Sequence, residues 1–456
     1  MTEAATRWER LRDAALQPTD AAALGVFRVV LGLIGVVSVT RIYAYGWTQD
    51  LFFRARVQFR YDGFEWLPSP TPALVHAALI TVAVCGALVA LGLFYRPAIV
   101  GYALAFVYIE TTDVTNYLNH YYLLTWLCLL GAALPLHRAY SLDARRLRLA
   151  PYAPAWCTWA LRFMVGTVYF YAGMAKFNTD WLLHAQPLQI WLSSRTETPV
   201  IGPLLDRVWV AYLMAWAGFL YDTSIAFFLL ARPTRPYAFL AVVGFHVATR
   251  ALFPIGMFPF IMVGSALVFF SPSWPRRWLG PARELAPPVP TVSPRWFAAG
   301  AAAFSLFVGF HTLMPLRCHL YGGDVAWHEQ GMRFSWRVML REKNGAVTYR
   351  VRDLASGRTT EVNPRRYLTD RQAREFSSQP DLILQLARVI AADRRAEGER
   401  VAVYADTRVS WNGRPGAPLI DPGVDLATVE DGVGRASWIL PAPTEPPARF
   451  SRVASR

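Results

Sequence analysis

Residues 155–176 read AWCTWALRFMVGTVYFYAGMAK, an apolar run that contains one arginine and ends on a lysine. A run of about 20 mostly apolar residues can cross the hydrocarbon core of a bilayer as one helix. Only two of the 46 basic residues in the chain are lysines, Lys176 and Lys343. Because arginine stays charged whereas a buried lysine can lose its proton, Lys176 indicates chemistry that needs a neutral amine. The alternative is a lysine that extends its ammonium to the membrane surface.

Apolar runs of this kind fill residues 21–316, and charged residues make up only 17% of the chain, against about 25% in soluble domains. The other runs lie at 21–43, 72–94, 99–117, 121–136, 208–231, 237–270 and 296–316. The run at 237–270 is too long for one ordinary helix and is interrupted at 250–256, so we expect two shorter helices there. The predicted fold class is a membrane α-helical, multi-span bundle with about eight to nine crossings.

Basic residues in the loops predict the orientation of this bundle. They gather at 1–20, 137–148, 232–235 and 276–277, and the positive-inside rule assigns such segments to the cytoplasm. All four share one side only if 237–270 crosses twice, which gives about nine crossings. The N-terminal segment 1–20 is then cytoplasmic and the C-terminal domain extracytoplasmic. The same scattered arginines account for the net charge of +14, so no nucleic-acid partner is expected.

Residues 317–440 read as a C-terminal extramembrane domain of α+β type, rich in strands. A Pro-rich linker at 271–294 comes before the last span, and the Pro-rich tail 441–456 is expected to be disordered. The turn sequence Lys343-Asn344-Gly345 predicts a hairpin. The alternation and periodicity of apolar residues predict strands at 332–341, 346–353, 358–362 and 400–404, and helices at 370–376 and 380–393.

Cysteine and histidine spacing predicts no metal site. The chain has four cysteines, and none of them forms a Cys-x-x-Cys pair. His319, His328 and Glu329 lie close together in sequence, but their spacing matches no standard set of zinc ligands.

Ionisable residues inside the apolar runs are candidates for function, because each one costs several kcal/mol at bilayer depth unless it is paired. With nine crossings, Lys176, His120 and His246 all lie in the outer half of the bilayer, which favours a site there. Two interpretations stay open for Asp222, Arg250 and Glu110, which either orient helices as ion pairs or relay protons. The structural partners expected for the acids are Arg28 and Arg41.

Several segments resemble vitamin K-dependent gamma-carboxylases and their bacterial relatives, whose membrane part is called the horizontally transferred transmembrane (HTTM) domain. The segment from Tyr169 to Phe177, followed by Asp180-Trp181, is similar to the part of that family that carries its catalytic lysine. Similar motifs, in the same order along the chain, are Asn119 to Leu123, Asp222, Phe245-His246 with Leu252 to Phe258, Tyr321 to Val325 and Arg333 to Trp336.

This resemblance implies an enzyme that uses a reduced vitamin K or menaquinol-type naphthoquinone together with O2 and CO2. In that family a neutral lysine deprotonates the quinol, the quinone becomes an epoxide, and the base so formed removes a γ-proton from a peptide or protein glutamate, which then takes up CO2. The resemblance assigns the role of base to Lys176 and contact with the quinone oxygen or its anion to His120, with His246 as a third catalytic residue. The residues it implies in quinone binding are Asn119, Tyr121, Tyr171, Phe177 and Met257.

The chain departs from the family in two ways. Ala175 stands where animal members have a second lysine, and no segment is recognisable as a propeptide-binding surface. The quinone–oxygen half of the chemistry is therefore a stronger expectation than carboxylation. Two other classes stay open: a membrane protein that binds quinone or lipid without catalysis, and a proton-coupled transporter built on Glu110, Asp113 and Asp222. The transporter has less support because the chain shows no internal repeat.

Overall fold

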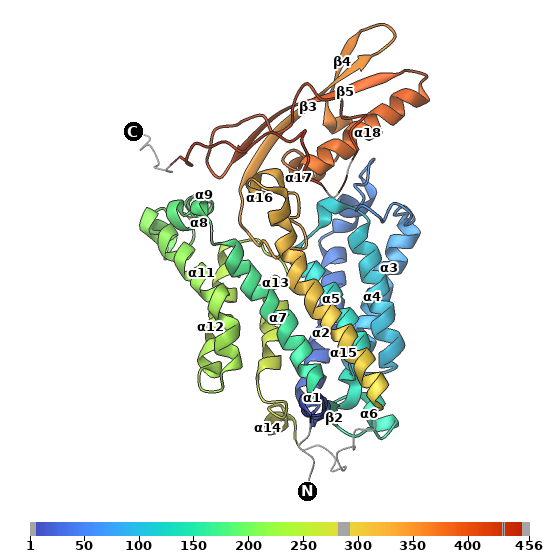
Figure 1. Ribbon diagram of the computed structural model, residues 1–456, viewed down its shortest axis with the longest axis vertical. Coiled ribbons are helices and arrows are strands. Elements are labelled where there is room, and N and C mark those ends of the chain that lie inside the picture. The colour runs from blue at the N-terminus through green and yellow to red at the C-terminus, as the bar shows by residue number, and fades with distance from the viewer. Residues whose placement is uncertain (1–5, 281–291, 431, 433, 449–456) are drawn as a thin grey trace.

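In the computed structural model, which describes residues 6–280, 292–430, 432 and 434–448, a helical bundle carries a smaller α+β domain at one end (Figure 1). The longer helices of the bundle are α2 (Ala22–Ala44), α3 (Pro72–Leu91), α4 (Tyr95–Thr111), α5 (Asn119–Ala133), α7 (Ala155–Ala175), α11 (Val208–Leu230), α12 (Arg235–Leu252), α13 (Phe258–Ala266) and α15 (Pro294–Leu313). Short helices are α1 (Arg7–Leu16), α6 (Leu142–Arg146), α8 (Thr179–His184), α9 (Leu188–Ser193), α10 (Gly202–Leu205), α14 (Arg276–Leu279) and α16 (Val325–His328).

Membrane-spanning character is clear for part of the bundle. Among the described residues, four helices are long and apolar enough to cross a bilayer: α2, α3, α11 and the continuous helical segment Pro294–Tyr321. The predicted break in the run at 237–270 is confirmed, because α12 ends at Leu252 and α13 begins at Phe258. Since α4 has 17 residues and α5 has 15, below the usual length of a span, the count of eight to nine crossings stays a prediction.

The basic segments gather at the end of the bundle opposite the C-terminal domain (Figure 1). Strand β1 (Pro18–Asp20) pairs antiparallel with β2 (Tyr152–Pro154), which ties the N-terminal segment to the loop before α7. Asp20 also forms an ion pair with Arg276 at 2.8 Å. These contacts bring three of the four basic segments together, as the loop charges predict. The side of the membrane that this end faces stays a prediction.

The expectation that Arg28 pairs with an acid is wrong. Its guanidinium is fully buried and donates to the backbone oxygens of Val89, Ala90 and Tyr140 at 2.5, 2.6 and 2.6 Å. Carbonyl oxygens at the end of α3 satisfy the donors that a carboxylate would otherwise take. Arg28 therefore fixes α2 against the end of α3 and the loop that follows α5.

The C-terminal domain is a three-stranded antiparallel sheet of order β4-β3-β5, and α17 (Asp370–Phe376) and α18 (Pro380–Ala396) pack on it. Its strands are β3 (Lys343–Asp353), β4 (Thr359–Val362) and β5 (Val401–Trp411). Strand β4 and both helices confirm the prediction, and β5 is longer than expected. Phe59, from the loop before α3, lies in the core of this domain and stacks on Phe376 at 6.1 Å.

Two predictions for this domain are wrong. Lys343-Asn344-Gly345 forms no hairpin turn, because these residues belong to β3 and pair with residues 409–411 of β5. Residues 332–341 form no strand. They run along the boundary between the bundle and the domain, and Phe334, Trp336 and Met339 have left-handed backbone with φ of 64°, 55° and 52°, which an extended strand excludes.

The Pro-rich tail has a defined course over 441–448, contrary to the expected disorder. The backbone oxygen of Glu445 accepts from Arg414 Nε at 2.7 Å, and Ala448 N donates to the oxygen of Gly413 at 3.4 Å. The remainder of the tail, 449–456, and residues 281–291 of the Pro-rich linker lie outside the described residues.

Candidate active site

Lys176 is buried in an ion pair with Asp222. Lys176 Nζ lies 2.7 Å from Asp222 Oδ2, and both side chains are less than a tenth exposed. The amine also donates to the backbone oxygen of Ala172 at 3.0 Å and lies 5.3 Å from the centre of the Trp181 ring. The lysine therefore does not extend to the membrane surface. It faces inward, toward α11 and the start of α8.

Gly173 is the reason that α7 and α11 approach closely enough for this pair. A Cβ atom at Gly173 would lie 2.5 Å from Thr223 N and 2.9 Å from the carbonyl carbon of Asp222. Only a glycine lets the two backbones touch here, in the way that small residues do at helix contacts inside membranes. Helix α7 then ends, with Lys176 as its C-terminal cap, so the amine reaches the carboxylate across the contact.

His246 completes a group of polar side chains around one small cavity. Its Nε2 atom is hydrogen-bonded to the hydroxyl of Tyr169 at 3.1 Å. Its Nδ1 atom is buried and has no hydrogen-bond partner within the described part of the chain. Lys176, Asp222, Tyr169 and His246 line a cavity of about 90 Å³, which we call the Lys176 cavity. Most of its remaining wall is apolar and comes from residues that include Trp181, Phe245, Phe253, Phe258, Met262 and Met339.

His120 lies next to this cavity but is not among the residues that line it. The rings of His120 and His246 both contact Phe258, with centroids 6.0 and 5.7 Å from its ring. Gly256, which has a left-handed backbone with φ of 59°, lies beside the His120 ring. The three bases predicted to share one layer are therefore neighbours, although only Lys176 and His246 line a common cavity.

The predicted quinone contacts are spread over several places. Asn119 donates through Nδ2 to the oxygen of Arg337 at 3.4 Å, and Tyr171 donates to the oxygen of Thr312 at 2.6 Å. Phe177 is 68% exposed, and Met257 is buried in the core of the bundle. Tyr121 lines a separate cavity of about 340 Å³. None of these five residues lines the Lys176 cavity.

The residues proposed for a proton relay do not form one group either. Glu110 accepts from Thr125 Oγ1 at 2.9 Å and lines the same separate cavity as Tyr121. Arg250 is exposed in the last turn of α12. Asp222 is the only one of the three that lies beside Lys176, and its role as an ion-pair partner is visible.

The HTTM domain model matches residues 16–274, which are more than half of the chain's 456 residues. The matched part contains all the residues that line the Lys176 cavity except those from the segment 331–341. The chain belongs to the HTTM family. A second model, the lumenal domain of vitamin K-dependent gamma-carboxylase, matches residues 298–445 of this HTTM protein. The two matches make it a carboxylase-related multi-pass membrane protein. No solved structure matches the chain.

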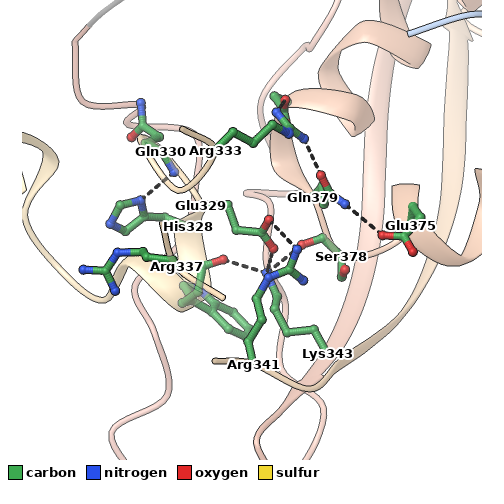
Figure 2. Close-up of polar contacts among 12 residues, drawn as sticks. His328, Glu329, Gln330, Arg333, Arg337, Arg341, Lys343, Glu375, Ser378 and Gln379 are labelled. Atoms are coloured by element: carbon green, nitrogen blue, oxygen red, sulfur yellow. Dashed lines mark hydrogen bonds and ion pairs between the residues drawn. The ribbon is translucent and has the colours of Figure 1, made fainter. Parts of the chain in front are cut away.

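A second, polar cavity of this HTTM protein lies where the bundle meets the C-terminal domain. This junction cavity has a volume of about 420 Å³ and shares Met339 with the Lys176 cavity. It is lined by the cations Arg333, Arg337, Arg341, Lys343 and Arg374 and by the acids Glu329, Glu342 and Glu375. Figure 2 shows Lys343 and Arg341 converging on Glu329, with distances of 2.9 Å for both ion pairs.

Lys343, the other lysine of the HTTM protein, is fully buried in this wall. Its three donors meet Glu329, the oxygen of Trp327 at 2.8 Å and the oxygen of Ser378 at 2.6 Å. Burial lowers the pKa of Lys343 to about 8. Glu329 opposes this shift in pKa, and the charge of Arg341 adds to it. Both lysines of the chain are thus buried and paired with carboxylates.

Replacing Lys343 with methionine is expected to remove a pH-dependent part of the stability. Burial lowers the pKa of Lys343 from 10.5 in the unfolded chain to about 8 in the folded chain. Between pH 8 and 10.5, Lys343 is therefore protonated in the unfolded chain and has lost its proton in the folded chain. The contribution of Lys343 therefore rises with pH across this window. Thermal unfolding of wild type and variant at a series of pH values measures the difference. Arg341 still pairs with Glu329 in the variant, and parallel profiles would contradict the assignment.

Sequence reasoning assigned no role to Tyr169, Trp181 or Met339, which line the Lys176 cavity. Tyr169 had a usable signal, because it precedes Lys176 by seven residues and so lies on the same face of α7. Trp181 belongs to the segment that resembles the carboxylases, but the sequence did not predict that its ring lies over the amine of Lys176. Met339 had no signal, because the segment around it is irregular and reaches the site from the C-terminal domain.

Proposed function

We propose that this HTTM protein is a membrane enzyme that uses a reduced naphthoquinone of the vitamin K or menaquinol type, and O2, to generate a strong base. The observation that carries the proposal is Lys176 Nζ, buried 2.7 Å from Asp222 in a largely apolar cavity. The two family matches support it, because they cover the membrane part and the lumenal domain of a gamma-carboxylase.

The residues of the Lys176 cavity fit a quinol in chemistry. Aromatic walls from Trp181, Phe245 and Phe258 suit a flat ring, and the free Nδ1 atom of His246 suits a hydroxyl group. The volume of about 90 Å³ is smaller than the roughly 150 Å³ that holds a benzene ring, so a naphthoquinone requires widening. Met339 lines both this cavity and the junction cavity and has a left-handed backbone, so we propose that its displacement joins the two.

Asp222 gives Lys176 a way to become a neutral amine. An ammonium–carboxylate pair and an amine–carboxylic acid pair differ only in the position of one proton. Because burying two charges costs several kcal/mol, a ligand that fills the cavity and excludes water shifts the ion pair toward the second form, in which Asp222 holds the proton. Lys176 Nζ then has a lone pair and takes up one proton from a hydroxyl group placed in the cavity. The Tyr169 hydroxyl fixes the His246 ring, so that Nδ1 faces that same space.

The apolar wall has its own part in this proposal. When bound, the reduced naphthoquinone would react with O2 to form an epoxide and so supply the base that removes a γ-proton from glutamate. Apolar side chains such as Phe253, Ile255 and Met262 exclude the water that would quench such a base. A substrate carboxylate and CO2 reach the site through the junction cavity, whose arginines favour an anion.

The proposed orientation follows from the basic end of the bundle. We place that end, with the N-terminal segment, in the cytoplasm and the C-terminal domain outside the cytoplasmic membrane of a bacterium. The quinol reaches the Lys176 cavity from the bilayer, and an acidic peptide reaches the junction cavity from the extracytoplasmic side. Labelling of single cysteines introduced at Trp8 and at Leu354, both exposed, with a membrane-impermeant reagent tests this orientation. Modification of Trp8→Cys in intact cells would contradict it.

The activity itself is tested with purified protein, menaquinol, O2 and labelled bicarbonate. Formation of the quinone epoxide is expected, because that step needs only the Lys176 cavity. Label in peptide glutamate would extend the proposal to carboxylation, whereas epoxide without label would restrict it to quinol oxidation. Quinol that binds but is never converted would contradict the enzyme and favour a quinone-binding protein.

A further inference from the structure

Strand β3 has one edge that is only partly covered. On one side it pairs with β5 along its whole length, from Lys343 to Asp353. On the other side β4 covers only Tyr349 to Arg352. Among the described residues, no strand therefore lies beside the part of β3 from Lys343 to Thr348 on that side. An uncovered edge presents unpaired N–H and C=O groups and is a template for another strand.

The ladder identifies the residues whose backbone faces this open edge. Asn412 N donates to the oxygen of Glu342 at 2.8 Å, so residue 342 bonds toward β5, and alternation along an antiparallel pair gives the same direction to 344, 346 and 348. Asp353 N donates to the oxygen of Arg358 at 2.9 Å, which confirms that odd-numbered residues face the opposite side. The N–H and C=O groups of Gly345 and Val347 consequently face the open edge.

A groove follows this edge on the surface of the C-terminal domain. It has a volume of about 340 Å³ and is lined by residues 344–347 of β3, residues 363–365, and residues 373, 374, 376 and 377 around the end of α17. The two charged residues in its wall, Arg365 and Arg374, are cations, and no acid lines it. Arg365 also forms an ion pair with Asp370 at the surface. We call this depression the edge groove.

The edge groove leads toward the site. It shares Asn344 and Arg374 with the junction cavity, which in turn shares Met339 with the Lys176 cavity. The three adjoining spaces differ in their walls. The edge groove is polar and has two cations, the junction cavity has five cations and three acids, and the Lys176 cavity is mostly apolar. A chain held at β3 therefore lies next to the junction cavity at the boundary with the bundle.

We propose that the open edge of β3 binds an extended acidic peptide as an added antiparallel or parallel strand, with backbone hydrogen bonds to Gly345 and Val347 and carboxylates facing Arg374. This inference rests on the proposed function only in that the peptide carries the acid on which the enzyme acts. Backbone pairing is independent of side chains, so it gives affinity for many sequences, while the cations select acidic ones. The edge of β3 thereby recognises a class of peptide rather than a single sequence.

The test measures fluorescence anisotropy of a labelled alternating Ala-Glu peptide with the detergent-solubilised full-length protein, without quinol. The decisive variant is Val347→Pro, which removes one N–H group from the open edge. Proline is tolerated where the missing N–H faces away from the partner strand, so β3 and β5 are expected to stay paired. Binding should weaken about tenfold, the effect of roughly one hydrogen bond and a poorer fit. Arg374 is exposed, and among the described residues its side chain makes no hydrogen bond or ion pair, although its backbone oxygen accepts from Ser377 Oγ. Arg374→Glu should therefore weaken binding similarly.

Changes in the peptide provide a second test that does not depend on the folding of any variant. An Ala-Glu peptide that is N-methylated at every residue keeps the charge but lacks every backbone N–H, and an alternating Ala-Lys peptide reverses the charge. Both are expected to bind at least about tenfold more weakly than Ala-Glu. Equal binding of the N-methylated peptide, or undiminished binding by Val347→Pro, would overturn the added strand, and equal binding of Ala-Lys would overturn the acidic partner. Since no quinol is present, failure here is distinguishable from failure of epoxidation.

Discussion

Replacing Lys176 with arginine is expected to abolish quinol epoxidation while the fold persists. Arginine keeps the positive charge that faces Asp222 across 2.7 Å in wild type, but it does not release its proton in proteins and cannot act as the base. Loss of a general base lowers rates by roughly 10² to 10⁴. The measurement is epoxide formed per minute by purified variant and wild type at matched protein concentration, alongside quinol binding, which should persist.

A second pair of variants separates chemistry from stability. Lys176→Met leaves Asp222 as a buried carboxylate without its partner, a change that costs about 3–5 kcal/mol. The double variant Lys176→Met with Asp222→Asn removes both charges and should regain most of that stability. Neither variant should form epoxide. If the stable double variant retained epoxidation within about tenfold of wild type, Lys176 would not be the base.

The helices of the bundle are predictable from the sequence because they coincide with long apolar runs. Runs such as 155–176 predict their helices to within a few residues, because burial in lipid leaves the backbone no alternative to a helix. The pairing of Lys176 with Asp222 was not predicted, although both residues were singled out. It depends on the contact of Gly173 with α11, and a contact between residues 46 positions apart leaves no local pattern.

The hairpin predicted at Lys343-Asn344-Gly345 shows how a local signal is overridden. Asn-Gly is a strong turn signal because both residues tolerate positive φ. Here the glycine serves another purpose, since a Cβ at Gly345 would lie 2.2 Å from the oxygen of Ser377. The residue is needed where the turn between α17 and α18 touches β3. Without knowledge of that packing, a glycine required for close approach cannot be distinguished from one required for a turn.

The proton-transport alternative loses its main support from the sequence once these positions are known. Glu110 and Asp222 were candidates for one relay, yet they line separate cavities. Asp113 is also removed from the site, because its carboxylate accepts from Thr115 and, at 2.7 Å, from Gln372 of the C-terminal domain. A proton relay needs these acids close to one another, and the sequence did not resolve the directions of their side chains.

Arg414 carries the second large effect, because it attaches the C-terminal domain to the segment that covers Lys176. Its guanidinium makes two bonds of 2.7 Å to Asp180, at the start of α8, and both side chains are buried. Asn412 Nδ2 adds a third bond to Asp180 at 2.9 Å. The next residue, Trp181, is the one whose ring lies over the lysine. No pattern in the sequence connects 414 with 180.

Replacing Arg414 with alanine is therefore expected to lower the free energy of unfolding by about 3–5 kcal/mol, since Asp180 is left as a buried charge. Arg414→Lys keeps the charge but loses the two-pronged geometry and should fall between alanine and wild type. Adding Asp180→Asn to Arg414→Met should recover most of the loss. Chemical denaturation in detergent gives these free energies, and hydrogen exchange of α8 shows whether the segment over Lys176 loosens with them. A loss below about 1 kcal/mol for alanine would mean that the pair behaves as an exposed salt bridge and does not hold the domain in place.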